Sequence, residues 1–476
     1  MAIASTGTPA AARLRRTLTL WDLILYGVIV IQPVAPMSVF GVLSQRGHGH
    51  VVTTILIAMV AMLFTAISYG RMARAYPSAG SAFTYVGQEI NPALGYVTGW
   101  SMVMDYMLNP MICIIWISQQ AHVFAPGVPY AAWAVFFALV FTGLNVQGVK
   151  TSARVNTALA AGMGVVIAIF FVAAARYVFG HPHDGAAFVT RPFYDPQSWN
   201  TKAVLGGTSV AVLTYIGFDG ISTLSEEAEN PRRNILLATV LTCLVIGILS
   251  AVEVYAAQLI WPASQPYPDV DTAFTFVAGR AWAPLFAIIG FTLVVANFGS
   301  GMGAQLGAAR LLYGMGRSGA LPKSFFGAVD TKRHVPRNNV LFVGALALAG
   351  AFCLPWIAAI PSVLERFLTS GHLRPPTTSG YELGANLLNF GALIAFMGVN
   401  AAAFVRYYLH EEKKKLTNLL PPVFGFVICL LLWLSLSTMA LIFGAIWMAI
   451  GIAFGAWKTH GFRGNLVDFE LPLEES

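Results

Sequence analysis

The sequence predicts an all-α, polytopic membrane protein, and three observations carry this prediction. The 476 residues are 57% hydrophobic and only 10% charged, with a mean hydropathy of +0.68. A soluble domain carries about 25% charged residues, so this chain lacks the polar side chains to cover itself in water. Its apolar residues are gathered in runs of roughly 20, the length at which a helix crosses a bilayer. Its basic residues fall mainly in every second connecting segment.

The apolar runs predict twelve transmembrane spans separated by short polar segments. The spans are expected at about 21–45, 51–72, 93–120, 129–149, 155–179, 203–228, 234–260, 273–300, 339–360, 382–409, 421–437 and 439–457. This division leaves an N-terminal tail at 1–20, a core at 21–409, spans eleven and twelve at 421–457, and a C-terminal tail at 458–476.

The distribution of Lys and Arg predicts the topology. Roughly three quarters of the 28 basic residues lie on one side of the predicted spans, together with both termini. Because basic loops stay in the cytoplasm, both termini are expected there, in a multi-pass protein of the inner (cytoplasmic) membrane. Topology thus accounts for the net charge of +7, and no nucleic-acid partner is predicted.

The cysteines and histidines disfavour metal and catalytic chemistry. The four cysteines lie in apolar runs, and all nine histidines fall in loops or at span ends. Buried cysteines act as small hydrophobic residues, and a metal site needs paired ligands at suitable spacing, so neither metal nor cofactor is predicted. An intramembrane enzyme needs a nucleophile with its base, or paired metal ligands, at membrane depth. The sequence therefore disfavours an enzyme, and it excludes a channel less firmly.

The first predicted span contains a break. Pro33 and Pro36 remove two backbone donors near mid-membrane, beside the polar side chain of Gln32. A proline kink in a packing helix is the structural alternative. Two prolines beside a glutamine favour unwinding, and unwound backbone in a membrane must line a cavity. The residues expected to contact a substrate here are Ile31, Gln32, Pro33, Val34, Ala35, Pro36 and Met37.

The sixth predicted span contains a second break. Gly217 and Gly220 flank Asp219 about 15 residues into the span, near its middle. A charged group at that depth costs roughly 2.5–3.5 kcal/mol, so it should face protein or water. The structural alternative is an Asp that caps the second half-helix. Tyr215, Gly217, Phe218, Asp219 and Gly220 are the expected substrate contacts at this break.

The two breaks occupy corresponding places in two halves of the chain. Broken segments at matching positions are typical of transporters built from inverted repeats, here about 21–179 and 203–409. Half-helix N-termini attract a carboxylate, and freed carbonyls attract an ammonium group or cation. The pattern therefore predicts a transporter of small amines or amino acids.

Four stretches resemble the amino acid–polyamine–organocation transporter superfamily. They are 70–85 (GRMARAYPSAGSAFTY), 99–106 (GWSMVMDY), 217–235 (GFDGISTLSEEAENPRRNI) and 310–317 (RLLYGMGR) with the following Leu321-Pro322. The resemblance covers nearly the whole chain. It implies the leucine-transporter-type fold of five plus five inverted spans with two additional C-terminal helices. It also implies a secondary transporter driven by protons or by exchange.

Within that superfamily the chain is most similar to the putrescine importer branch, through 66–70 (AISYG), 390–396 (FGALIAF) and Asn400. The branch pattern has an Asp where this chain has Ser38, and a diamine favours two acidic partners. Some proton-coupled relatives carry a Lys where this chain has Met163. The Ser38 departure favours an amino acid over a diamine, with a putrescine or polyamine importer as the alternative. The Met163 departure means that this coupling device is absent.

Further polar residues are weighed as site residues. Asp105, near the middle of the third span, is a proton-coupling candidate together with Asp219, or else a structural hydrogen-bonding group. Tyr106 and Asn297 are expected to line the cavity, with inter-helix hydrogen bonding as the alternative. The gate candidates are Phe218, Glu227 and Arg232. For the two charged gate candidates a solvated helix end is the alternative, and for Phe218 simple packing.

Overall fold

The computed structural model describes residues 18–461 apart from 77–80, 149–152, 184, 226–227, 318–320, 331–332, 334, 370–377, 413 and 460. This part of the chain is helical, with two isolated bridges and no strand among the described residues. The α-helices are α1 (Leu20–Ile31), α2 (Ala35–Arg46), α3 (Val51–Ala75), α4 (Ser81–Glu89), α5 (Pro92–Phe124), α6 (Tyr130–Val146), α7 (Ala153–Gly180), α8 (Gly185–Thr190), α9 (Thr201–Ala211), α10 (Pro231–Ile260), α11 (Ala273–Ala281), α12 (Leu285–Arg317), α13 (Lys323–Phe326), α14 (Arg337–Thr369), α15 (Gly380–Phe404), α16 (Leu416–Leu434) and α17 (Thr438–Lys458). Two 3₁₀ segments, η1 (Val212–Tyr215) and η2 (Phe218–Leu224), follow α9, and a π-helical turn, η3 (Val405–Leu409), follows α15.

The spans confirm the all-α polytopic class. Among the described residues, ten helical segments are long and apolar enough to cross a membrane, and α1 with α2 forms a further span bent by 47°. The shorter apolar helix α6 is the twelfth. The tails predicted at 1–20 and 458–476 lie largely outside the described residues.

The predicted bounds of the eighth and eleventh spans were wrong, and the helix of the eighth also runs to Arg317, well past the predicted end at 300. The eighth span begins at Leu285, because Pro284 and an extended Trp282 separate it from the short helix α11. The eleventh begins at Leu416 although Pro421 and Pro422 lie inside it. Pro421 cannot donate to the carbonyl of Thr417, and the guanidinium of Arg71 donates to that carbonyl instead, at 3.1 Å.

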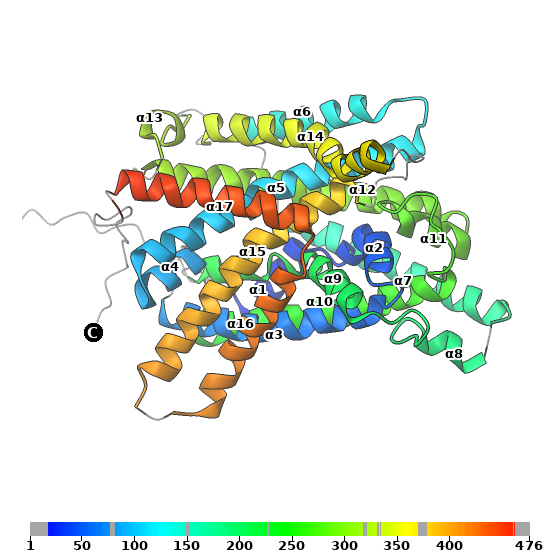
Figure 1. The fold of residues 1–476 in the computed structure, drawn as a ribbon, viewed down its shortest axis with the longest axis horizontal. Helices are drawn as coiled ribbons and strands as arrows, with labels where there is room; N and C mark the ends of the chain where they lie inside the picture. Colours follow the sequence, from blue (N-terminus) through cyan, green and yellow to red (C-terminus); the bar gives the residue numbers. More distant parts are fainter. Residues whose placement is uncertain are drawn as a thin grey trace, which may run out of the picture.

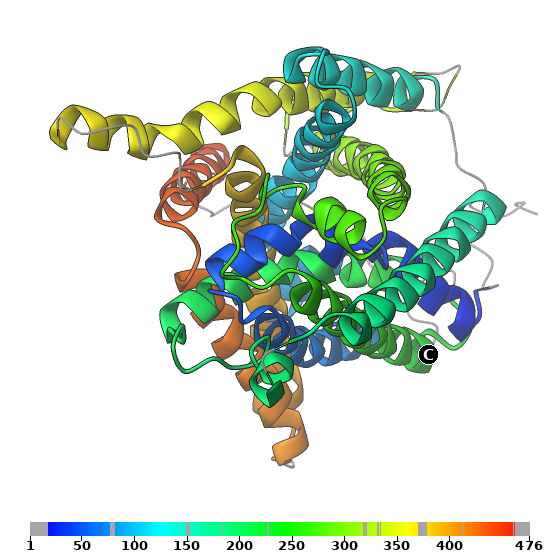
Figure 2. The same ribbon diagram turned by 90° about the vertical axis from the view of Figure 1, so that its right-hand side faces the viewer.

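Several helices run roughly along one direction, as Figure 1 shows for α5, α12 and α17, whereas α15 and α16 cross them obliquely. The long helix α5 packs along α12 and α15, and α3 packs along α10. The breaks of α1–α2 and α9–η2 lie within this bundle (Figures 1 and 2). Large apolar side chains such as Phe136, Leu139 and Val172 are exposed on α6 and α7, as expected of faces that meet lipid.

The last helix, α17, is fixed to α5 by a pair of tryptophans. The rings of Trp100 and Trp447 stack with centroids 4.7 Å apart. Each indole N–H donates to the other residue's backbone carbonyl, at 2.9 and 3.2 Å. The hydroxyl of Tyr96 adds a bond to the carbonyl of Gly451 at 3.0 Å. These contacts join α17 to the centre of the bundle.

Candidate functional site

The first break separates α1 from α2. The helix ends at Ile31, and Gln32 takes a left-handed φ of 69°. Pro36 is tolerated in the first turn of α2, where a missing N–H costs nothing. The side-chain amide of Gln32 donates to the carbonyl of Ala296 on α12. The structure therefore shows an interrupted helix, and the interruption is held by a neighbouring span.

The second break separates α9 from η2. Ile216 is extended, and Gly217 has φ 120° and ψ −17°. Residues with a Cβ rarely adopt such a conformation, so glycine is required at this position. The chain then continues as 3₁₀ turns through Phe218 to Leu224. Here too the sequence located the interruption of the helix correctly.

The two breaks touch each other. A Cβ placed on Gly217 would lie 2.9 Å from Cγ1 of Val30 and 3.6 Å from the backbone N of Ile31. Those two residues are the last of α1. The end of the first half-helix thus packs against the unwound turn of the sixth span, at the same depth in the bundle.

The carboxylate of Asp219 is held by the backbone of its own turn. The N–H of Gly217 donates to Asp219 Oδ1 at 3.2 Å, and the N–H groups of Asp219 and Gly220 also bond it. The hydroxyl of Ser222 donates to the Asp219 carbonyl at 2.6 Å. Asp219 is buried, with 5% of its surface exposed. The carboxyl group of Asp219 therefore caps its own turn and is buried as well.

A second carboxylate lies close by on α5. Asp105 is 7% exposed, and its side chain is within electrostatic range of Asp219. The phenols of Tyr69 and Tyr106 lie within range of both carboxylates. None of the described residues hydrogen-bonds the carboxylate of Asp105, and the hydroxyl of Tyr69 has no partner among them. Two acids and two phenols thus lie within electrostatic range of one another near the second break.

Tyr69 is a site residue that sequence reasoning missed. Its stretch, 66–70, was noted only for the family resemblance. A tyrosine in an apolar run is usually a packing residue, and its unpartnered hydroxyl becomes visible only when α3 and α5 are placed together. Tyr106, which was predicted, packs its ring within 3.3 Å of a Cβ position at Gly307 on α12.

Phe218 lies in an aromatic cluster on one side of the break. Its ring is fully buried and contacts Tyr69 edge-on at 5.5 Å and Phe396 at 5.3 Å between centroids. Tyr69 and Phe396 also contact each other at 5.9 Å. Such a cluster closes off this side of the region to water, which is compatible with either a gate or simple packing.

Asn297 and Ser38 meet on the other side of the break. The side-chain amide of Asn297 donates to the hydroxyl of Ser38 at 3.0 Å, joining α12 to α2. The buried indole of Trp116 donates to the carbonyls of Ser38, at 3.0 Å, and Asp271, at 2.8 Å. Ser38, the position that departs from the putrescine importer pattern, thus hydrogen-bonds α2 to both α12 and α5.

The other predicted substrate contacts are packed or hydrogen-bonded within the helix bundle. Tyr215 is fully buried and donates its hydroxyl to the carbonyl of Ile55 on α3, at 2.9 Å. The hydroxyl of Tyr215 is therefore already engaged in a hydrogen bond between two segments of the bundle. In the stretch 31–37, Gln32 and Ala35 are half-buried and the other residues are buried. The Cβ position of Gly220 has only the phenol of Tyr26 within 4 Å, with the hydroxyl at 3.7 Å and the ring carbon Cε1 at 3.9 Å.

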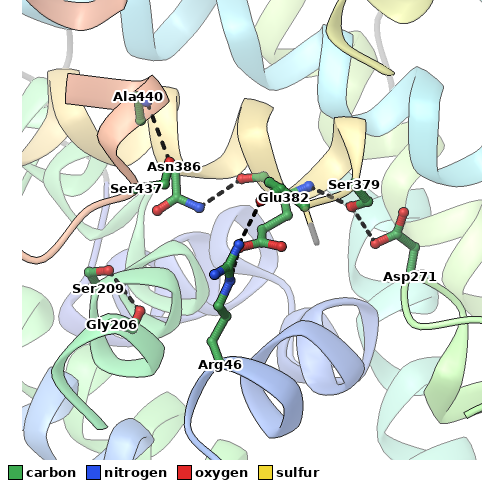
Figure 3. A network of polar contacts seen from close by, with 10 residues as sticks. Arg46, Gly206, Ser209, Asp271, Ser379, Glu382, Asn386, Ser437 and Ala440 are labelled. Carbon is green, nitrogen blue, oxygen red and sulfur yellow. Dashed lines mark hydrogen bonds and ion pairs between the residues drawn. The ribbon is translucent and has the colours of Figure 1, made fainter. Parts of the chain in front are cut away.

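A network of polar residues lies at the end of the bundle away from the end of α17 (Figures 1 and 3). Arg46, the last residue of α2, pairs with the carboxylate of Glu382 at the start of α15 and donates to the hydroxyl of Thr378 at 2.7 Å. Ser379, which caps α15, donates to Asp271 at 2.7 Å. We name these five residues the Arg46–Glu382 network. Sequence reasoning missed it because its members come from three distant segments.

The charged gate candidates are only partly described. Glu227 lies outside the described residues. Arg232 is exposed at the start of α10, and no described residue gives it a hydrogen bond or ion pair. The predicted pairing of these two residues thus stays a prediction.

The chain is similar to known transporters over nearly its whole length. It is 34% identical to the low-affinity putrescine importer PlaP of Escherichia coli (strain K12), covering 97% of this chain and 98% of that protein. It is 26% identical to the methylthioribose transporter of Bacillus subtilis, over 92% of each chain. It is 25% identical to the branched-chain amino acid permease BcaP of the same species, over 94% and 93%.

The fold matches a solved transporter as well. The crystal structure of the Eremococcus coleocola manganese transporter superposes with a TM-score of 0.51 at 11% identity, covering 95% of this chain and 97% of that one. This likeness concerns the fold alone, which is of the leucine-transporter type with additional C-terminal helices. The family model described as "Amino acid permease" matches residues 34–467. The chain therefore belongs to the amino acid permease family, within the amino acid–polyamine–organocation superfamily.

Proposed function

We propose that this protein binds the ammonium group of its substrate at the two touching helix breaks, beside Asp219. As a member of its family, the protein is a secondary transporter of amino acids or related small amines and not an enzyme. The observation that carries the proposal is the contact of Gly217 with the end of α1, beside two buried carboxylates.

Helix ends complement these carboxylates. The C-terminal end of α1 carries a partial negative charge, and the N-terminal end of α2 a partial positive charge. A bound amino acid would direct its ammonium group to the end of α1 and Asp219, and its carboxylate to the start of α2 near Ala35. We extend the proposal to coupling: Asp219 or Asp105 carries a proton during the cycle, since buried carboxylates without a fixed cation are suited to that task.

The remaining expectations form part of the same proposal. The inverted repeats span about 21–179 and 203–409, so that each break lies in the first helix of its repeat. The side rich in Lys and Arg, with both termini, faces the cytoplasm of an inner membrane. The Arg46–Glu382 network then lies at the outer side.

Uptake into proteoliposomes tests the proposal. A panel of labelled amino acids and amines is measured with and without an inward proton gradient. Saturable uptake of at least one compound, stimulated by the gradient, is expected. If the panel is transported but the gradient has no effect at any internal pH, the proton-coupling part is wrong. If no compound is transported or shifts the melting temperature, the substrate class is wrong.

A diamine importer is the second candidate, and one observation favours it. Two carboxylates, Asp105 and Asp219, approach one region, which offers both ends of a diamine an acidic partner. The 34% identity to a putrescine importer agrees with this reading.

Asp105→Asn separates the two candidates. If Asp105 holds a second ammonium group, the variant is expected to lose about 30-fold in diamine transport, because truncating a buried charge pair costs at least about 2 kcal/mol. Amino acid uptake would change by less than about threefold, within the range of a neutral hydrogen bond. Competition by putrescine and by a panel of amino acids is measured in the same vesicles. Equal losses for both substrates would instead indicate that Asp105 serves coupling.

The buried carboxyl group of Asp271 is expected to make closure of the outer side depend on pH. Burial raises the pKa of Asp271 from 3.8 to about 7, with Asp269 and Glu382 adding to the rise and hydrogen bonds from Ser379 and Gln119 opposing it. The described, closed arrangement therefore holds a proton more tightly than an opened one in which Asp271 meets water. Closure is therefore favoured at low pH. Its equilibrium constant falls by up to about tenfold per pH unit as the pH rises from roughly 4 to 7.

Cysteine labelling measures this effect. Ser38→Cys, in a chain whose native cysteines are replaced by Ala, is labelled with a membrane-impermeant maleimide across that pH range. After correction for the reactivity of the reagent, the labelling rate is expected to rise with pH and then level off. With Asp271→Asn the corrected rate should be flat. A rise of the same size in the Asp271→Asn protein would show that another group is responsible.

A further inference from the structure

We propose that a cavity lined by arginines, at the end of the bundle that we assign to the cytoplasm, binds the anionic phosphate group of a ligand such as a phospholipid. The cavity has a volume of about 400 Å³ and lies where α3, α10 and α15 end or begin. Its side chains are those of Arg74, Arg232, Arg406, Tyr407, His410 and Glu411. We call it the arginine cavity.

Two of its guanidinium groups have no partner in the part of the chain that the structure describes. Arg74, next to the end of α3, and Arg232, second residue of α10, are both exposed. None of the described residues gives either of them a hydrogen bond or an ion pair. Each presents five N–H donors in a planar fork that matches the oxygens of a phosphate.

The two carboxylates next to Arg406 and His410, those of Glu89 and Glu411, already have partners. Arg406 pairs with the buried carboxylate of Glu89 at 2.5 Å, and Tyr76 donates to the same oxygen at 2.7 Å. His410 lies 3.8 Å from the other oxygen of Glu89. Glu411 accepts a bond from Asn418 at 3.0 Å. Among the described residues, no carboxylate pairs with Arg74 or Arg232, and both add positive charge to the arginine cavity.

The start of α10 adds to this charge. The helix is 30 residues long, has no acidic residue in its first turn, and its N-cap Asn230 makes no side-chain capping bond. An uncapped N-terminus carries a partial positive charge and N–H groups suited to an anion. Because Arg232 is in this first turn, the helix terminus and these two guanidinium groups act on the same ligand.

The surroundings favour a ligand that comes from the membrane. Leu409, which directly precedes His410, is 52% exposed, and Leu416 at the start of α16 is 68% exposed. Leu420, one turn further along α16, is also exposed, and α16 packs against η3. Acyl chains would cover these leucines while the head group enters the cavity. Basic pockets between membrane helices on the cytoplasmic side are suited to anionic head groups.

A bound phosphate would join three helix ends that belong to both halves of the chain. The end of α3 lies in the first proposed repeat, and α10 and α15 lie in the second. The ligand therefore stabilises the arrangement in which these ends lie together, and its binding can be followed by thermal unfolding.

The test uses the full-length protein in neutral detergent and three probes: phosphatidylglycerol, phosphatidylcholine, and inorganic phosphate at matched ionic strength. Phosphatidylglycerol is expected to raise the melting temperature, and phosphatidylcholine is not. Arg74→Gln/Arg232→Gln should need about 30-fold more phosphatidylglycerol for the same shift, at about 1 kcal/mol for each arginine lost. The matched control is Arg233→Gln, which removes an exposed arginine next along α10 that does not line the cavity. Its response should equal that of the unaltered protein.

Each outcome decides the proposal. A shift with inorganic phosphate alone, lost in the double variant, would keep the phosphate site but assign it to a soluble ligand. Equal shifts in all three proteins, or no shift with either anion, would overturn it. If the double variant melts early without lipid, the phosphatidylglycerol retained by Arg232→Gln is compared with that retained by Arg233→Gln in native mass spectra. Equal retention would also overturn the proposal.

Discussion

Asp219→Asn is expected to fold normally and to lose at least about 30-fold in transport kcat/KM, the equivalent of about 2 kcal/mol. The side-chain oxygen of asparagine can still accept the bond that Gly217 now donates to Asp219, so the cap is retained. What disappears is the negative charge that the proposed site offers to an ammonium group. Initial uptake rates against substrate concentration, in vesicles with equal amounts of inserted protein, measure the loss.

The control for this variant is Asp195→Asn. Asp195 lies in a loop, where its carboxylate accepts a bond from the N–H of Gln197 at 3.0 Å, which asparagine can also do. Transport by this variant should be unchanged. If Asp219→Asn also transports normally and keeps its pH dependence, the residue is a helix cap and the ammonium site lies elsewhere.

Gly217→Ala is expected to have the second large effect, through the backbone. Alanine at φ 120° is strained, and its Cβ would meet the side chain of Val30 at 2.9 Å. Strain of this kind costs about 1–3 kcal/mol, and here it would push the end of α1 away from the second break. The melting temperature should fall. Transport should fall further than the loss of folded protein explains, because the two breaks would no longer touch.

The matched control is Gly303→Ala on α12, where an added Cβ meets nothing within 4 Å. It should melt at the original temperature or slightly above it, since alanine favours a helix over glycine. Thermal unfolding in detergent gives the melting temperature, and uptake by the same preparations gives the transport rate. If Gly217→Ala behaves like this control, the contact between the breaks is dispensable.

The sequence predicted those parts of the site that depend on local chemistry. Pro33 and the Gly217 turn determine the backbone conformation of their own segments. Both breaks could therefore be located without knowing which helices pack against them. Their shared role in one site was predicted from their matching positions in two halves, which is a symmetry argument, whereas their direct contact was not predicted.

The parts that could not be predicted are pairings between distant segments. Arg46 and Glu382 are 336 residues apart, and nothing local in either segment indicates the other. The unpartnered hydroxyl of Tyr69 likewise depends on how α3 and α5 are placed. The eighth span was predicted to begin too early because α11 is itself apolar, so hydropathy alone could not separate it from α12.

The two tryptophans that lock α17 to α5 have a consequence for alternating access. α5 carries Asp105 and Tyr106, so the reciprocal Trp100–Trp447 bonds connect α17 to the helix of the proposed substrate region. Any rocking of α5 during the cycle must carry α17 with it through the lipid. The membrane-facing surface of the transporter therefore changes shape together with its interior. Bilayer thickness and lateral pressure at α17 can then act on the conformational equilibrium without any ligand entering the bundle.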